Sequence, residues 1–129
     1  MLKFSLPVLV LATTLLAPIA PTFACDTWSV PGDLAIQQQN GYAVSVRHAT
    51  LNGKTLSGDA KYSGGRGDLD GSISKNGRLH FNITWDNGSV GVYTASVDDD
   101  GTVQDGRTYD KTHPANWSTF TMDALSCDD

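Results

Sequence analysis

The chain has 129 residues, of which 40% are hydrophobic and 18% are charged, and its formal net charge at pH 7 is −5. This length leaves room for one small domain. The sequence contains no run of basic residues, which argues against nucleic acid and anionic membranes as partners. All 14 acidic side chains are Asp and none is Glu, a composition that favours turns over helices.

The first 24 residues have the features of a secretory signal peptide. A positively charged start precedes an apolar run from Phe4 to Ala20, and Thr22 and Ala24 are small residues that suit a cleavage site before Cys25. We therefore expect residues 1–24 to be removed. Residues 25–129 would then form a single β-barrel domain that is secreted or periplasmic.

The two cysteines, Cys25 and Cys127, lie at opposite ends of this domain. In an exported protein we expect them to form a disulfide. Because bridged ends must be neighbours, this pairing favours a closed barrel. Lipid attachment at Cys25 is an alternative, although the preceding residues lack the Leu of a lipidation motif. We expect no membrane contact unless Cys25 is lipidated.

Turn signals recur about every dozen residues along the domain, as expected for a meander of antiparallel strands. Asn-Gly and Asp-Gly pairs supply the positive φ angles of tight hairpin turns. The signals are Asn40-Gly41, Asn52-Gly53, Gly64-Gly65-Arg66-Gly67, Asn76-Gly77, Asn87-Gly88, Asp100-Gly101 and His113-Pro114.

The segments between the turns predict eight principal strands and a short entry strand at 28–30. The clearest strand is 78–85, in which Leu79, Phe81, Ile83 and Trp85 alternate with polar residues. We expect an all-β fold, an antiparallel up-and-down meander that closes into a barrel of about eight strands. The predicted strands are 34–39, 42–49, 55–63, 69–75, 78–85, 89–97, 102–109 and 116–122.

Several short motifs carry a resemblance to known barrels. They are the early tryptophan and glycine turn of residues 28–32, the Leu-x-Gly strand starts at Leu56 and Leu69, the segment 81–87, and the late Trp117. With them the chain resembles the avidin and lipocalin group, the calycin-type secreted barrels. The resemblance implies the barrel but not biotin, because the polar ring of avidins has no match here and the lipocalin Gly-x-Trp is absent before Trp28.

A second set of motifs is Asn40-Gly41-Tyr42, the Trp-x-Asn-Gly of residues 85–88 and the Thr-Tyr-Asp of residues 108–110. These resemble a set of uncharacterised secreted bacterial barrel proteins. That likeness implies the same architecture and no particular chemistry.

Aromatic side chains with polar tips suit a small, partly apolar ligand at the open end of the barrel. Gln38 shares a strand face with Leu34 and Ile36 and could add a polar contact. The alternative is that the aromatic side chains only plug the barrel. The candidate ligand-binding residues are Trp28, Gln38, Tyr62, Trp85, Tyr93, Tyr109 and Trp117.

A second hypothesis is a protein-binding module, such as an inhibitor of a secreted hydrolase or an adhesion component, with a solid barrel and functional hairpin loops. Catalysis is not expected, because both cysteines are predicted to be bonded. We also expect no cofactor and no metal, because His48, His80 and His113 lack the spacing of a metal site. The partner would be a small molecule or a secreted protein.

Overall fold

The structure, a computed structural model, describes residues 23–129. This part of the chain forms ten β-strands and no helix. The strands are β1 (Trp28–Ser29), β2 (Leu34–Gln38), β3 (Ala43–Asn52), β4 (Thr55–Tyr62), β5 (Gly65–Ile73), β6 (Arg78–Trp85), β7 (Val90–Val97), β8 (Val103–Asp110), β9 (His113–Met122) and β10 (Ser126–Cys127).

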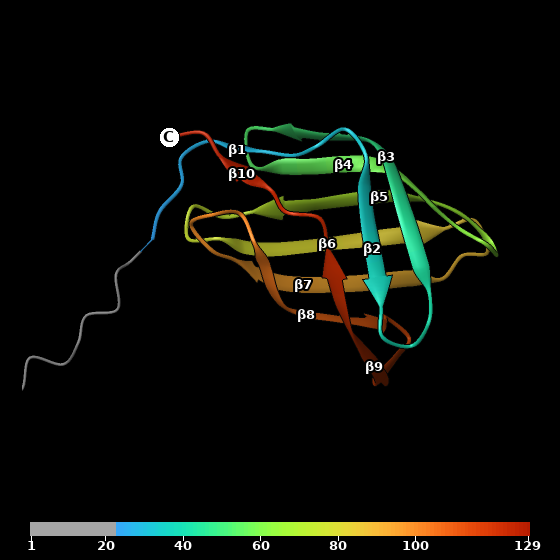
Figure 1. Cartoon of the computed structure of the whole chain (residues 1–129). Helices are drawn as coiled ribbons and strands as arrows, with labels where there is room; N and C mark the ends of the chain where they lie inside the picture. Colours follow the sequence, from blue (N-terminus) through green and yellow to red (C-terminus); the bar gives the residue numbers. More distant parts are fainter. Residues whose placement is uncertain (1–22) are drawn as a thin grey trace, which may run out of the picture.

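Strands β2 to β9 form a closed antiparallel barrel (Figure 1). Each of these strands pairs with its neighbours in sequence, and the barrel closes where Gln37 of β2 lies opposite Thr121 of β9. The predicted all-β barrel of about eight strands is confirmed. Strands β1 and β10 pair with one another in a separate two-stranded sheet.

Most strand boundaries lie within two residues of the prediction, but β3 continues to Asn52, and β5 and β9 begin earlier than predicted. Gly64-Gly65-Arg66-Gly67 was expected to be a loop, but β5 already begins at Gly65, which lies opposite Tyr62. Strand β9 begins at His113, which lies opposite Asp110, so His113-Pro114 is not the turn. In both hairpins only two residues separate the strands. A strand can contain glycine at a bend and proline near its first residue, so Gly65 and Pro114 do not prevent β5 and β9 from extending to the turns.

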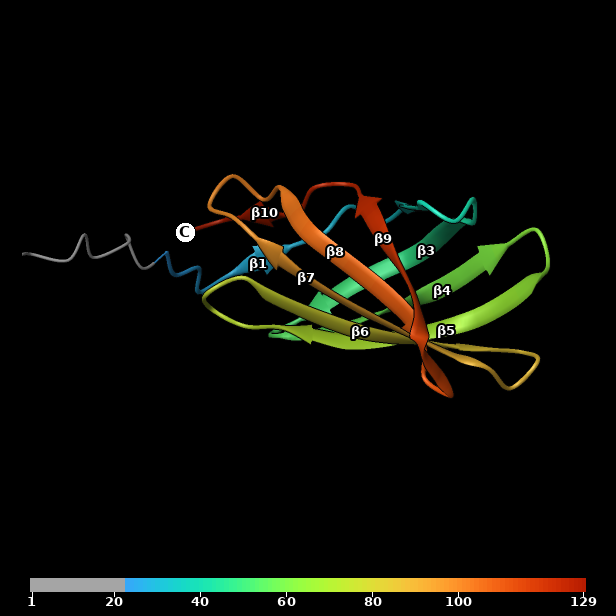
Figure 2. The ribbon, with the colours of Figure 1, turned by 90° about the horizontal axis from the view of Figure 1, so that it is seen from below.

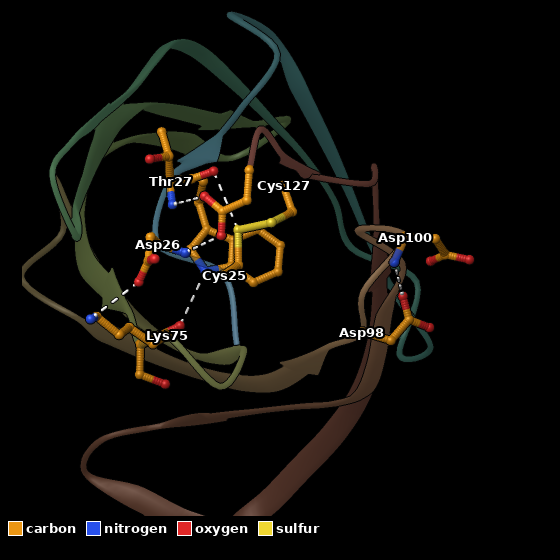
Figure 3. The surroundings of a disulfide bond; sticks show 10 residues. Cys25, Asp26, Thr27, Lys75, Asp98, Asp100 and Cys127 are labelled. Atoms are coloured by element: carbon orange, nitrogen blue, oxygen red, sulfur yellow. Dashed lines mark hydrogen bonds and ion pairs between the residues drawn. A yellow bond between two sulfur atoms is a disulfide. The ribbon is translucent and has the colours of Figure 1, made fainter. Parts of the chain in front are cut away.

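The disulfide joins the two ends of the domain, as predicted. Cys25 and Cys127 are bonded with a Cα–Cα distance of 5.9 Å, and Figure 3 shows the bond beside Asp26, Thr27 and Lys75. The backbone amides of Asp26 and Thr27 both donate to the carboxylate of Asp129, at 2.6 and 3.0 Å. A disulfide in the domain is consistent with an oxidising compartment outside the cytoplasm.

The terminal segments close one end of the barrel. Trp28 and Leu125 are both buried in the core cluster, and the indole Nε1 of Trp28 donates to the carbonyl of Ser74 in the β5–β6 turn at 3.1 Å. The amide of Leu125 donates to the carbonyl of Gly101 in the β7–β8 turn at 2.9 Å. Figure 2 shows β1 and β10 at this end, with the β4–β5 and β6–β7 turns at the other.

The middle of the barrel is filled by side chains. Phe81 and Tyr93 stack with ring centroids 4.7 Å apart, and Phe120 contacts the Tyr93 ring edge-on at 5.3 Å. The same core cluster contains further apolar side chains that are almost fully buried: Ile36, Val46, Leu56, Leu69, Ile73 and Leu79.

Strand glycines allow this dense packing. A Cβ added to Gly71 would lie 2.2 Å from the carbonyl oxygen of His80 and 2.3 Å from the Cβ of Phe81. A Cβ at Gly58 would lie 2.7 Å from a methyl carbon of Val46. The absence of a side chain at these two strand glycines therefore makes room for their bulky neighbours.

The predicted signal peptide falls almost entirely on residues 1–22, which lie outside the described residues. Phe23, the first described residue, packs its ring edge-on against Trp28 at 5.6 Å. No helix within residues 23–129 has the length and apolar character needed to cross a membrane.

Candidate functional site: a cavity at the open end

The end of the barrel opposite the termini holds a cavity of about 310 Å³. This volume lies at the small end of the range for small-molecule sites. The cavity is lined by Gln38, Asn40, Tyr42, Val44, Tyr62, Trp85, Asn87, Ser89, Val90, Gly91, Tyr93, Thr108, Tyr109, Asp110 and Asn116.

The floor of the cavity is a buried polar group of three side chains. The amide nitrogen of Gln38 donates to the hydroxyl of Tyr93 at 2.6 Å, and Tyr93 also hydrogen-bonds to the side chain of Thr108. Gln38 and Thr108 are only 8% and 5% exposed. Burial raises the pKa of Tyr93 to about 12, so its hydroxyl stays protonated at neutral pH.

One wall of the cavity is aromatic. The ring of Tyr62 lies edge-on to Trp85 at 4.7 Å and to Tyr42 at 5.8 Å, measured between ring centroids. Tyr62 and Trp85 are the last residues of β4 and β6, on the same inward face as the buried Ala60 and Ile83. The alternation that builds the core therefore carries aromatic side chains to the barrel mouth.

Polar side chains form the rim. Asn40, Asn87 and Asn116 come from three different hairpins at this end. Asp110 accepts hydrogen bonds from the backbone amide and the hydroxyl of Thr112, both at 2.9 Å, and these bonds lower the pKa of Asp110. The rim can therefore offer amide and carboxylate groups to a ligand.

Five of the seven candidate residues line this cavity: Gln38, Tyr62, Trp85, Tyr93 and Tyr109. The other two lie elsewhere. Trp28 is 5% exposed and fills the closed end of the barrel. Trp117 is 52% exposed on the outer wall, where the guanidinium carbon of Arg107 lies 4.2 Å from the centroid of its ring.

Sequence reasoning did not select Tyr42, Thr108 or Asp110. Tyr42 precedes the buried Val44 by two residues and so continues its inward face, which strand alternation could have revealed. Thr108 lies opposite the buried Tyr93 and therefore faces inward. Predicting this pair requires knowing where the bulge between β7 and β8 shifts the register of the two strands. The sequence carried no signal for that pairing.

The outer wall has a second hollow, of about 820 Å³, over β3 to β6. Its ionisable side chains include both acids and bases, and the contact of His48 Nδ1 with Asp59 Oδ2 at 2.9 Å is largely exposed, at 82% and 68% for the two side chains. Exposed contacts of this kind contribute little to stability. This hollow therefore resembles an ordinary charged surface more than a built site.

No protein family, curated protein or solved structure matches this chain. The barrel shape is shared by several unrelated groups of proteins and does not single out the avidins or lipocalins. The likeness to those families stays a prediction.

Proposed function

We propose that this protein is an exported β-barrel that binds a small, partly apolar ligand in the cavity at its open end. The observation that carries the proposal is the contrast within the barrel. Apolar side chains form one buried core that includes Tyr93, whereas a cavity lined by Tyr93, Gln38 and Thr108 opens at the end opposite the termini. The proposal includes neither a catalytic step nor a cofactor.

The polar floor argues against a simple plug. Burying the polar side chains of Gln38 and Thr108 is unfavourable unless they are hydrogen-bonded, and an apolar pair would fill the same place without that requirement. Keeping them beneath an aromatic wall gives the arrangement typical of ligand sites, in which a few polar groups orient a mainly apolar ligand.

A cavity-filling variant tests the proposal. Gly91 lies on the inward face of β7, and a Cβ there would lie 3.1 Å from the Tyr93 ring and 3.6 Å from the Trp85 indole nitrogen. Gly91→Val therefore places a side chain in the cavity after a small shift of the Tyr93 ring. Ser96→Val is the matched control, because it adds the same side chain to the exposed face of β7.

Both variants would be screened against a broad set of small metabolites by calorimetry and thermal shift. We expect compounds that bind the wild type and Ser96→Val to lose binding to Gly91→Val, while far-UV circular dichroism shows all three folded. Retained affinity in a folded Gly91→Val protein would place the ligand elsewhere and overturn the proposal.

A second candidate function is protein binding through the outer wall. Trp117 and Arg107 form an exposed cation–π pair, and Trp and Arg are enriched among the residues that dominate protein interfaces. Trp117→Ser should abolish capture of a stoichiometric secreted partner that Gly91→Val still captures. If instead Gly91→Val alone loses the partner, the outer wall is not the interface.

Export is part of the proposal and has its own test. Mass spectrometry of the protein purified from the secreted or periplasmic fraction should give the mass of residues 25–129 with one disulfide. A mass that retains residues 1–24 would contradict cleavage, and an added lipid mass would establish anchoring at Cys25.

A further inference from the structure

We propose that the cavity at the open end selects a small organic cation, an amine or quaternary ammonium with an apolar body, over a carboxylate of the same shape. This inference rests on the proposed function and specifies the charge of its ligand. Three features carry it: the charged groups around the cavity, its aromatic wall and the acceptor on its floor.

The charged groups at the cavity favour a cation. Among the described residues that line it, Asp110 is the one with an ionised side chain, and none is Lys, Arg or His. The two hydrogen bonds from Thr112 occupy one carboxylate oxygen of Asp110. They leave the other oxygen without a partner among the described residues. Lys111 and His113 belong to the same hairpin, but neither lines the cavity.

The aromatic wall supplies the second feature. A cation within about 6 Å of an aromatic face is attracted by the negative potential of the ring, and several rings around one site strengthen this attraction. Tyr42, Tyr62 and Trp85 form a continuous row of rings at the mouth. A carboxylate in the same place would gain no such attraction and would find no positive side chain lining the cavity.

The floor adds a neutral acceptor. Since the amide nitrogen of Gln38 donates to Tyr93, the amide is oriented. Its Oε1 accepts no hydrogen bond from any residue that the structure describes. An ammonium N–H needs acceptors, and Gln38 Oε1 and the free oxygen of Asp110 are both available at this cavity. A carboxylate would find only neutral donors at this cavity, such as the amides of Asn40, Asn87 and Asn116, because no Lys, Arg or His lines it.

Three probes that share one phenyl ring and a short chain isolate the effect of charge: 2-phenylethylamine, 2-phenylethanol and 3-phenylpropanoate. Calorimetric titration of the purified protein at neutral pH should show the amine binding about tenfold more tightly than the carboxylate, with the alcohol between them. Equal affinities for all three probes would overturn the charge selectivity but leave the proposed ligand site standing. Binding of none would contradict both.

Variants separate the site from the overall negative charge of the protein. Asp110→Asn keeps an oxygen that can accept from Thr112, and it should weaken amine binding about threefold while leaving the alcohol unchanged. Asp99→Asn removes the same charge from the exposed β7–β8 turn at the opposite end, and it should change neither. Equal losses in the two variants would show that only net charge matters, which refutes the inference.

Tyr62→Leu tests the aromatic wall, because leucine keeps the apolar surface and removes the ring. The variant should lower the affinity for the amine more than the affinity for the alcohol. Equal losses for the two probes would show that the wall acts only as apolar surface, and the cation–π part of the inference would be wrong.

Discussion

Removing the disulfide should cost this domain a large part of its stability. Cys25 and Cys127 are 102 residues apart in sequence, so their bond closes almost the whole domain into one loop. In the chain-entropy treatment, a crosslink that closes a loop of about 100 residues stabilises the folded state by about 4.7 kcal/mol at 25 °C. The total stability of such domains is only about 5–15 kcal/mol.

The assay is urea unfolding of the double variant Cys25→Ala/Cys127→Ala against the wild type. Replacing both residues avoids a free thiol. We expect the free energy of unfolding to fall by about 3–5 kcal/mol. We also expect Trp28, which the terminal segments hold at the closed end, to become exposed at a lower urea concentration than the one at which the barrel strands unfold. Fluorescence and far-UV circular dichroism report the two events separately.

The wild type treated with a reductant provides the control, because it should lose the same stability without any change of sequence. A loss below about 1 kcal/mol in both proteins, with Trp28 still buried, would refute the reasoning. It would show that the pairing of β1 with β10 and the bonds from Asp26 and Thr27 to Asp129 hold the ends together without the crosslink.

Three further predictions concern residues of the barrel strands, namely Gly71, Tyr93 and His48. Gly71→Ala should destabilise the fold by about 3 kcal/mol through overpacking, whereas Gly32→Ala, with open space around its Cβ, should be neutral; equal urea midpoints would contradict this. The folded pKa of Tyr93 is about 12, above the unfolded value of about 10, so its contribution to stability is complete below pH 10. Stability should therefore fall by about 1.4 kcal/mol per pH unit from pH 10 to 12, and a Tyr93→Phe protein with the same slope would disprove it. His48 has a positive φ of 54° at the β3 bulge, so His48→Gly should be about 1 kcal/mol more stable than His48→Ala, as measured by thermal melting.

The barrel itself could be predicted from the sequence because its evidence is local. The alternation of Leu79, Phe81, Ile83 and Trp85 sets which face of β6 is buried, and that pattern needs no knowledge of neighbouring strands. The pairing of Cys25 with Cys127 then requires the chain ends to meet. Both expectations are confirmed.

The positions of the three tryptophans could not be predicted as directly from the sequence. Trp117 has the size of a core residue, but Phe120 fixes the inward face of β9 and so directs Trp117 outward. Trp28 follows Cys25 closely, so the disulfide holds it at the terminal end, away from the cavity. Their shared chemistry suggested one common site for the aromatic side chains. The tryptophans lie apart because alternate residues of a strand face opposite sides of the sheet, and because Trp28 and Trp85 lie at opposite ends of the barrel.

The three indole resonances test the central claim most directly. Trp85 lines the cavity, Trp28 fills the closed end and Trp117 lies on the outer wall, so an ¹⁵N-labelled sample titrated with a ligand reports all three places in one spectrum. We predict that 2-phenylethylamine shifts the Trp85 indole N–H resonance in a saturable manner and leaves those of Trp28 and Trp117 in place. A saturable shift of Trp117 alone, or an unmoved Trp85 resonance at concentrations where calorimetry shows binding, would contradict a ligand site at the open end of the barrel.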